Sequence, residues 1–461
     1  MRKETISNGT SPLPKAKFPP QIKYIVGNEA AERFSFYGMR AILVVFMIQY
    51  LLMPESESKG LYHLFVSACY FTPLLGGYLA DRYWGKYKTI MLLSLFYCAG
   101  HAALALFDGK PGMYAGLALI AFGAGGIKPC VSANVGDQFT KENSHLIKKV
   151  FDLFYFAINF GAFFSTLLIP KVLSVYGHRW AFGIPGILMG IATLVFWMGR
   201  KQYVYVPPTG KQNAMHFVPI VLHCLARIGS RKGAHWLDCA REKFREDQVE
   251  GAKAAVAVLK VFVLVAMFWS LYDQTASTWV IQAQRMDRAV LGHVIEAAQM
   301  QALNPIFIMI MIPIFSLGLY PLVEKMGVRV TSLRKMGCGM ILIAVSFVWA
   351  GFLQIAIDAG QSVNIAWQFF PYLLLTAAEI LVSITGLEFA YTQAPKEMKS
   401  TLMSFWLLTI MAGNMLTAVI SYLNKFPGAL EFFFYATVMG VVSLIFVWVA
   451  TNYKERNYLV S

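Results

Sequence analysis

The chain has 461 residues, of which 57% are hydrophobic and 14% are charged. Soluble domains contain about 45–50% apolar residues, so this composition excludes an ordinary soluble protein and indicates an integral membrane protein. The formal net charge of +15 could suggest a nucleic-acid partner. The basic residues, however, gather in alternate connections between apolar segments, so we attribute them to membrane topology and expect no nucleic-acid partner.

Apolar runs of about 20 residues recur from end to end, each long enough to cross a bilayer core of about 30 Å as a helix. They predict an all-α integral membrane protein with twelve transmembrane helices in two six-helix bundles. The predicted spans are residues 22–52, 58–81, 87–107, 112–134, 149–174, 180–199, 254–281, 300–323, 332–357, 365–393, 400–424 and 429–451. The expected parts are a tail (1–21), a bundle (22–199), a basic linker (200–253), a second bundle (254–452) and a tail (453–461).

Lysine and arginine are concentrated in the N-terminal tail and in the connections that follow even-numbered spans, such as those with Arg82 and Arg329. The positive-inside rule therefore places both termini and the longest loop in the cytoplasm. The first twenty residues are polar and carry no short apolar core, so no cleavable signal peptide is expected. We expect a plasma-membrane location, in a bacterial inner membrane.

The first span carries four ionisable side chains within "GNEAAERFSFYGMRAIL". They are Glu29, Glu32, Arg33 and Arg40. Each would cost about 2.5–3.5 kcal/mol at the centre of a bilayer, so lipid cannot surround them. At about 100° per residue, all except Glu32 project within about 100° of one another together with Phe36 and Tyr37, and Glu32 widens the arc to about 140°. This face must line a cavity or pair with partners inside the bundle.

The second span ends in "GGYLADRYWGKYKT", and the eighth ends in a related segment, "GLYPLVEKMGVRVTS". Each combines a helix-end glycine, an adjacent acid and base, and further cations. The first segment resembles the loop signature of the major facilitator superfamily, and the second resembles a degraded copy. The resemblance implies two six-helix halves that open alternately to the two sides of the membrane. It also implies that Asp81 and Arg82 belong to a gating loop.

The fourth span contains "GAGGIKP", which could be mistaken for a phosphate-binding loop. It lacks the strand-to-helix setting that such a loop needs, so close helix packing is the favoured interpretation. No zinc-protease motif or nucleophile elbow occurs in a suitable context either. We therefore expect a protein that is not an enzyme, with no cofactor and no metal.

The linker segment "FVPIVLHCLARI" is too short to cross a membrane and predicts a surface helix. Basic residues surround it, namely Arg227, Arg231, Lys232, Arg241, Lys243 and Arg245. A strap along the inner leaflet is the favoured interpretation, and a calmodulin-like or lipid-headgroup partner is the alternative. Four of the six cysteines fall in spans, and Cys224 and Cys239 fall in this cytoplasmic linker, so no structural disulfide is expected.

Polar and aromatic side chains on the other spans could complete a central site. They are His63 and Tyr70, Lys128, Tyr155 and Asn159, Trp269 and Asp273, Asn304, Glu379 and Ser383, and Trp406. Taken alone, a histidine or asparagine of this kind is better explained as a helix-interface group. Together, Arg33, Arg40 and Lys128 give the first half a cationic wall, whereas Asp273 and Glu379 give the second half an anionic wall.

A ligand with a carboxylate at one end and an ammonium at the other would fit between these walls. Short peptides are favoured over amino acids because many aromatic side chains leave room for variable side chains. One rival is a symporter of nitrate or an organic anion, which would use the cationic wall but would have little need for Glu379. Another is a non-transporting receptor or scaffold, which would need neither wall.

Six segments together resemble the proton-dependent oligopeptide transporters over essentially the whole set of spans. They are "EAAERFSFYG", "GAGGIKPCVSANVGDQF", "FDLFYFAINFG", "DQTASTW", "NPIF" and "AAEILVSITGLEFAYTQAPKEMKS". The resemblance implies proton-driven import of di- and tripeptides by alternating access, with membrane lipids as surroundings and no obligate protein partner. Some relatives carry nitrate or other small solutes, so family membership fixes the substrate less firmly.

The resemblance also implies roles for individual residues. The proton-coupling set is Glu29, Glu32, Arg33, Lys128, His63 and Asp273, with Lys128 as the partner of the first-span charges. The peptide-binding set is Arg33, Phe36, Tyr37, Arg40, Tyr70, Lys128, Tyr155, Asn159, Trp269, Asn304, Glu379, Ser383 and Trp406. Two features depart from the family pattern: Phe36 stands where tyrosine is usual, and the linker is too short for the two extra helices of many bacterial members.

Overall fold

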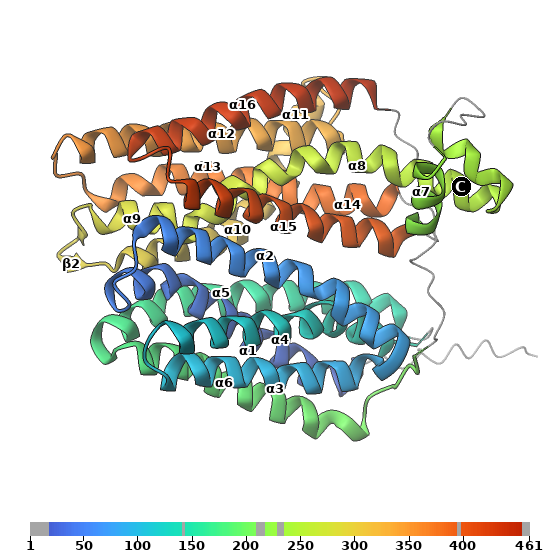
Figure 1. The fold of residues 1–461 in the computed structure, drawn as a ribbon, viewed down its shortest axis with the longest axis horizontal. Helices are drawn as coiled ribbons and strands as arrows, with labels where there is room; N and C mark the ends of the chain where they lie inside the picture. Colours follow the sequence, from blue (N-terminus) through green and yellow to red (C-terminus); the bar gives the residue numbers. More distant parts are fainter. Residues whose placement is uncertain (1–17, 141–142, 209–216, 228–234, 394–397, 454–461) are drawn as a thin grey trace, which may run out of the picture.

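The computed structural model describes residues 18–140, 143–208, 217–227, 235–393 and 398–453. Nearly all of this part is helical, and Figure 1 shows two bundles side by side. Most of each predicted tail lies outside the described residues. The first bundle contains α1 (Ile22–Gln49), α2 (Glu55–Leu79), α3 (Gly85–Leu106), α4 (Lys110–Asp137), α5 (Ile147–Tyr176) and α6 (His178–Met198).

The second bundle is built from shorter and more interrupted helices. It contains α8 (Glu246–Tyr272), α9 (Thr278–Gln284), α10 (Leu303–Pro313), α11 (Tyr320–Lys325), α12 (Ser332–Asp358), α13 (Phe369–Glu379), α14 (Thr385–Thr392), α15 (Lys399–Leu423) and α16 (Ala429–Asn452). A small hairpin after α9 pairs β1 (Ala289–Val290) antiparallel with β2 (His293–Val294), so that Ala289 lies opposite Val294. Contacts of α2 with α15 and of α5 with α10 join the two bundles.

Ten helical segments of the described part are long and apolar enough to cross a membrane. One of them, Glu55–Leu106, contains both α2 and α3. Helix α1 has 28 residues, which is a sufficient length, but its buried charges set it apart from the apolar segments. The predicted helical membrane fold is confirmed, whereas the count of twelve spans stays a prediction.

In the described part of the chain, three π-helical turns occur, and in each the wider backbone changes the direction of the side chains that follow. These turns are Ala80–Trp84 after α2, Ile314–Leu319 between α10 and α11, and Ile380–Ile384 between α13 and α14. Such turns are frequent at functional sites. The third begins directly after Glu379, the half-buried acid of the predicted peptide site.

The glycines of "GAGGIKP" lie inside α4, where neighbouring helices approach closely. A Cβ atom added to Gly126 would lie 2.1 Å from Cδ1 of Leu93 on α3, and one added to Gly125 would lie 2.8 Å from the carbonyl oxygen of Thr72 on α2. Across the same contact, a Cβ on Gly76 would lie 2.1 Å from the carbonyl oxygen of Gly125. Close helix packing is therefore confirmed for this segment.

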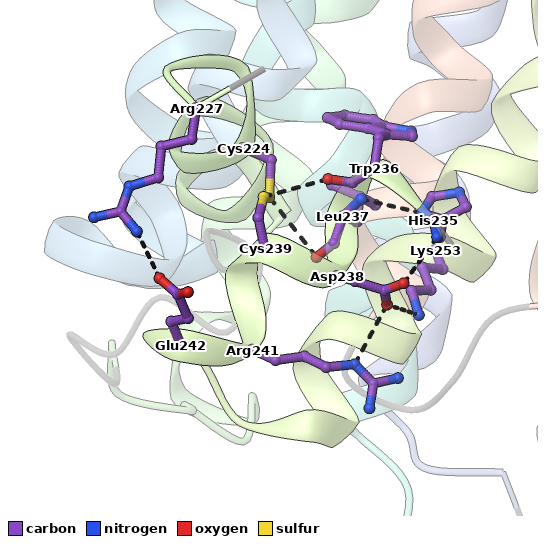
Figure 2. The surroundings of a disulfide bond; sticks show 10 residues. All are labelled: Cys224, Arg227, His235, Trp236, Leu237, Asp238, Cys239, Arg241, Glu242 and Lys253. Carbon is purple, nitrogen blue, oxygen red and sulfur yellow. Dashed lines mark hydrogen bonds and ion pairs between the residues drawn. A yellow bond between two sulfur atoms is a disulfide. The ribbon is translucent and has the colours of Figure 1, made fainter. Parts of the chain in front are cut away.

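The linker contains the short helix α7 (Phe217–Leu225), which packs Phe217 against Phe405 of α15 with ring centroids 5.1 Å apart. The expectation of no structural disulfide was wrong, because Cys224 and Cys239 are joined (Figure 2). The chain folds back after α7 into a 3₁₀ turn, Trp236–Glu242, and this brings the two Cα atoms within 6.0 Å.

Ion pairs on the surface of the linker support this fold-back. Arg227 donates to Glu242 at 2.7 Å, and Lys253 at the start of α8 lies 2.5 Å from Asp238 (Figure 2). The hydrogen bond from Lys253, together with one from the His235 backbone N–H, lowers the pKa of Asp238 to about 2. The linker is thus tied both to itself and to the second bundle.

Candidate functional site

A cavity of about 360 Å³ lies between the two bundles and is lined by residues from both. Ten of the thirteen predicted peptide-binding residues line it: Tyr37, Arg40, Tyr70, Tyr155, Asn159, Trp269, Asn304, Glu379, Ser383 and Trp406. The remaining three, Arg33, Phe36 and Lys128, are not among its lining residues. Tyr272, Gln301 and Tyr372 also line the cavity and were not predicted.

Glu379 supplies a carboxylate to the cavity wall of the second bundle. It is the last residue of α13, and the π turn that follows places Ile380, Ser383 and Ile384 on the same cavity wall. The amide nitrogen of Asn304 donates to Glu379 at 2.6 Å and to the Thr376 hydroxyl at 3.2 Å. Asn304 therefore holds the Glu379 side chain in place, with its carboxyl group at the border of the cavity.

Arg40 and Asp273 come from different bundles and form a buried ion pair at the cavity edge. Arg40 also donates to the Tyr62 hydroxyl, and Asn414 donates to the other oxygen of Asp273 at 2.6 Å. We expected these two charges on opposing walls with a ligand between them. Instead, the two side chains contact each other. The bundles approach closely where Arg40 and Asp273 lie, and each charge compensates the other in a buried setting.

An amide, Asn414, bridges His63 and Asp273, two members of the proton-coupling set that the family resemblance implies. The nitrogen of Asn414 donates to Asp273, and its oxygen lies 2.8 Å from Nδ1 of His63. Since that oxygen can only accept, Nδ1 carries the proton and donates. Nε2 lies 2.8 Å from the Ser277 hydroxyl, which donates to it when the imidazole is neutral. Protonation of Nε2 reverses this bond and requires the hydroxyl to turn.

The charges of the first span form a compact cluster beside the cavity. The Arg33 side chain donates from Nε to Glu29 at 2.7 Å and lies 3.2 Å from Glu32. The arginine thus joins an acid one helical turn earlier to the acid immediately before it. The buried carboxylate of Glu32 accepts no hydrogen bond from the residues described.

Lys128 was predicted to be the ionic partner of this cluster, but it forms no ion pair within the described part of the chain. Its ammonium lies 3.8 Å from the ring centroid of Phe36 and 4.5 Å from that of Tyr70, an arrangement typical of cation–π contacts. It also has no hydrogen-bond partner among the described residues. The groups in contact with the ammonium are therefore two aromatic faces rather than a carboxylate.

The predicted gating-loop residues Asp81 and Arg82 are exposed in the π turn after α2. The Arg82 guanidinium lies over the rings of Tyr78 and Tyr83, 5.8 Å and 5.6 Å from their centroids. In the same motif, Lys86 forms an ion pair of 2.5 Å with Asp137 at the end of α4. A gating role for the loop stays a prediction.

A second buried ion pair between the bundles was missed in the sequence. Lys59 near the start of α2 contacts both oxygens of Glu431 near the start of α16, at 2.8 Å and 2.6 Å. Thr278 of α9 contacts the same carboxylate at 3.4 Å. Glu431 could have been identified from the sequence because it is a charged residue inside the last apolar span. Lys59 gives no such signal, because it lies among other polar residues. No cluster that could hold a metal ion occurs among the described residues.

Comparison with known proteins identifies the family. A sequence model of the POT family matches residues 87–430, which is most of the chain. The chain belongs to the POT family. The crystal structure of the POT family transporter PepTSo is similar, with a TM-score of 0.89 and 41% identity, covering 95% of this chain and 99% of that one. An auto-inhibited POT family peptide transporter has a TM-score of 0.86 and 43% identity, covering 95% and 98%.

Curated relatives of this POT family chain are solute carriers and peptide transporters of animals. The human solute carrier family 15 member 2 is 40% identical over 81% of this chain and 54% of its own length. Peptide transporter family 2 of Caenorhabditis elegans is 40% identical over 74% of this chain and 48% of its own length. The chain thus spans about half the length of the curated relatives that it matches.

Proposed function

We propose that this chain is a proton-coupled symporter that imports di- and tripeptides by alternating access. We place it in a plasma membrane, the bacterial inner membrane, with both termini in the cytoplasm. The observation that carries the proposal is the cavity between the bundles, which combines the Glu379 carboxylate with polar side chains of the opposite bundle in a POT family chain. Its volume of about 360 Å³ lies at the lower end of the usual range for small-ligand sites.

Glu379 supports a substrate with an ammonium group. A peptide amino terminus next to this carboxylate forms a charge-assisted hydrogen bond. Nitrate or an organic anion would instead meet a like charge on this wall, which disfavours the alternative substrate class. Tyr37, Tyr155 and Trp269 add aromatic surfaces around the same space, and these suit variable peptide side chains.

Proton coupling is supported by the chain of groups from Ser277 through His63 and Asn414 to Asp273 and Arg40. A proton on Asp273 would cancel the charge that holds Arg40 across the two bundles. The bundles could then separate at this end and admit a peptide. Release of the proton from Asp273 on the other side of the membrane would restore the ion pair with Arg40 and close the cavity again.

Competition between peptides tests the substrate class. In proteoliposomes, dipeptides and tripeptides with free ends should inhibit uptake of labelled dialanine, because both end charges contribute to binding. Dialanine with an acetylated amino end and an amidated carboxyl end should compete poorly, as should single amino acids and nitrate. Equal competition by blocked and free dialanine would rule out recognition of the peptide ends.

The variant Glu379→Gln tests the ammonium site, because it keeps the shape and the hydrogen-bonding capacity but removes the charge. We expect uptake of dialanine to fall by at least about tenfold, the loss that corresponds to one charged hydrogen bond of about 1.5 kcal/mol or more. Glu388→Gln on the neighbouring α14 is the matched control and should transport normally, since its side chain is 56% exposed. Near-normal uptake by Glu379→Gln would move the ammonium site elsewhere.

A further inference from the structure

A second cavity, of about 790 Å³, lies away from the central site, where α11 ends, α12 begins and α16 ends. Figure 1 shows these segments on the outer side of the second bundle. The walls are mainly apolar and include Gly337, Ile341, Phe446 and Val447. Ile341 and Val447 are exposed, so the groove is continuous with the apolar surface that faces lipid in a membrane-embedded bundle.

Three cations lie at the polar end of this groove: Arg329 in the connection between α11 and α12, and Arg334 and Lys335 in the first turn of α12. Arg329 and Arg334 are exposed, and neither has an ion-pair partner among the described residues. The Arg334 guanidinium donates to the backbone oxygen of Arg329 at 3.0 Å, which holds the two residues together. Lys335 lies over the Tyr320 ring at 5.3 Å and is 3.6 Å from Glu388, so part of its charge is already compensated.

We propose that this groove binds one anionic phospholipid of the surrounding bilayer. Its phosphate lies between Arg329 and Arg334, and an acyl chain follows Gly337, Ile341 and Val447 toward the middle of the membrane. Adjacent cations and apolar surface match the two chemical parts of such a lipid. A peptide or a soluble anion would satisfy only the polar end and would leave the apolar walls uncovered.

Gly337 helps to shape the groove. A Cβ atom at this position would be in ordinary contact with Phe446 and Val447, at 3.6 Å and 3.8 Å, so a larger side chain would extend into the space between α12 and α16. The groove also reaches Leu381, which belongs to the same π turn as the central-cavity residues Ile380, Ser383 and Ile384. The bound lipid therefore supports the outer side of the wall that carries the central site. Binding of the lipid does not depend on the transport activity proposed above.

Cys338 provides a direct probe, because it is an exposed free cysteine in the groove wall. After Cys98→Ser removes the half-buried cysteine, a fluorophore on Cys338 reports nearby lipid in nanodiscs. Brominated phosphatidylglycerol should quench this fluorophore more strongly than brominated phosphatidylcholine at the same mole fraction. Arg329→Gln with Arg334→Gln should weaken the preference for the anionic lipid by about thirtyfold, since each cation near the surface contributes about 1 kcal/mol.

The matched control neutralises two cations in the 3₁₀ turn that follows α6, Arg200→Gln with Lys201→Gln, and should leave the preference unchanged. Soluble glycerophosphoglycerol and inorganic phosphate should not relieve the quenching, because they lack acyl chains. Equal quenching by the two brominated lipids would overturn the proposal. Displacement by either soluble anion, or an undiminished preference in the double arginine variant, would overturn it as well.

Discussion

At the scale of single residues, the molecule keeps buried charges in three different states. The Arg40 and Asp273 side chains compensate each other across the bundles. Arg33 is shared by two acids of its own helix, and Lys128 lies between aromatic rings without an ion pair in the described part. Neither carboxylate oxygen of Glu32 accepts a hydrogen bond from the described residues, so we choose Glu32 to test proton coupling in the first span.

We predict that Glu32→Gln uncouples transport from the proton gradient. The amide cannot titrate, so uphill uptake of dialanine driven by an imposed pH gradient should be lost. Peptide counterflow should continue at a reduced rate, because the residue lies outside the lining of the cavity. Both assays are made on the same reconstituted protein.

Glu324→Gln, in the exposed end of α11, serves as the control and should concentrate dialanine normally. If Glu32→Gln still concentrates dialanine against its gradient, the first-span charges are structural pairs. Proton coupling would then reside with His63 and Asp273.

At the scale of helices, glycines determine how closely α2 and α4 pack. The neighbours Gly76 and Gly77 differ sharply, since an added Cβ would meet backbone of α4 at the first and nothing within 4 Å at the second. We predict that Gly76→Ala lowers the melting temperature in detergent, because overpacking costs about 1–3 kcal/mol. Gly77→Ala should keep or raise the melting temperature, since alanine favours a helix by up to about 1 kcal/mol over glycine. Equal shifts for the two variants would contradict the close contact of α2 with α4.

The packing of the helices and the partners of their side chains can be predicted from the sequence only in part. Charges in an apolar span require a hydrated surface or partners inside the bundle, so the polar face of α1 follows from residue spacing. Spacing and the family resemblance together indicate many of the polar and aromatic residues of the cavity lining, but not its apolar residues. The partners of the buried side chains do not follow from the sequence, because they depend on how the two bundles pack against each other. Asn414, for example, is a single amide in an apolar span, and such an amide is compatible with any helix interface. The Cys224–Cys239 bond depends on the fold-back of a linker that has no periodic pattern. Similarly, the rings of Phe36 and Tyr70, rather than charge alone, determine the position of Lys128.

At the scale of the whole molecule, bonds between the bundles gather at the end that carries the starts of α2 and α16. Two of these are the buried pair of Lys59 with Glu431 and the exposed pair of Glu55 with Arg285. Removal of one partner from a buried pair typically costs about 3–5 kcal/mol, whereas an exposed pair contributes about 0–1 kcal/mol. The two pairs should therefore differ in how strongly they hold the bundles together.

We predict that Glu431→Gln increases the population of conformations in which the two bundles lie farther apart at the starts of α2 and α16. The reason is that Lys59 is left buried beside an uncharged group. Spin labels on Leu52→Cys and Leu291→Cys, two exposed positions on different bundles, should show a larger share of long distances. Glu55→Gln is the control and should leave the distance distribution nearly unchanged. If Glu431→Gln has the same distance distribution as the doubly labelled protein with Glu431 intact, the buried ion pair does not restrain the bundles.

The most direct test of proton-coupled peptide symport is uptake of labelled dialanine into proteoliposomes with an imposed inward proton gradient. A gradient of one pH unit supplies about 1.4 kcal/mol per proton, and a membrane potential of 100 mV supplies about 2.3 kcal/mol per charge. Symport with one proton therefore predicts accumulation up to a few hundredfold, and its collapse when a protonophore dissipates the gradient. Equilibration of dialanine without accumulation, unchanged by the protonophore, would contradict proton-coupled symport.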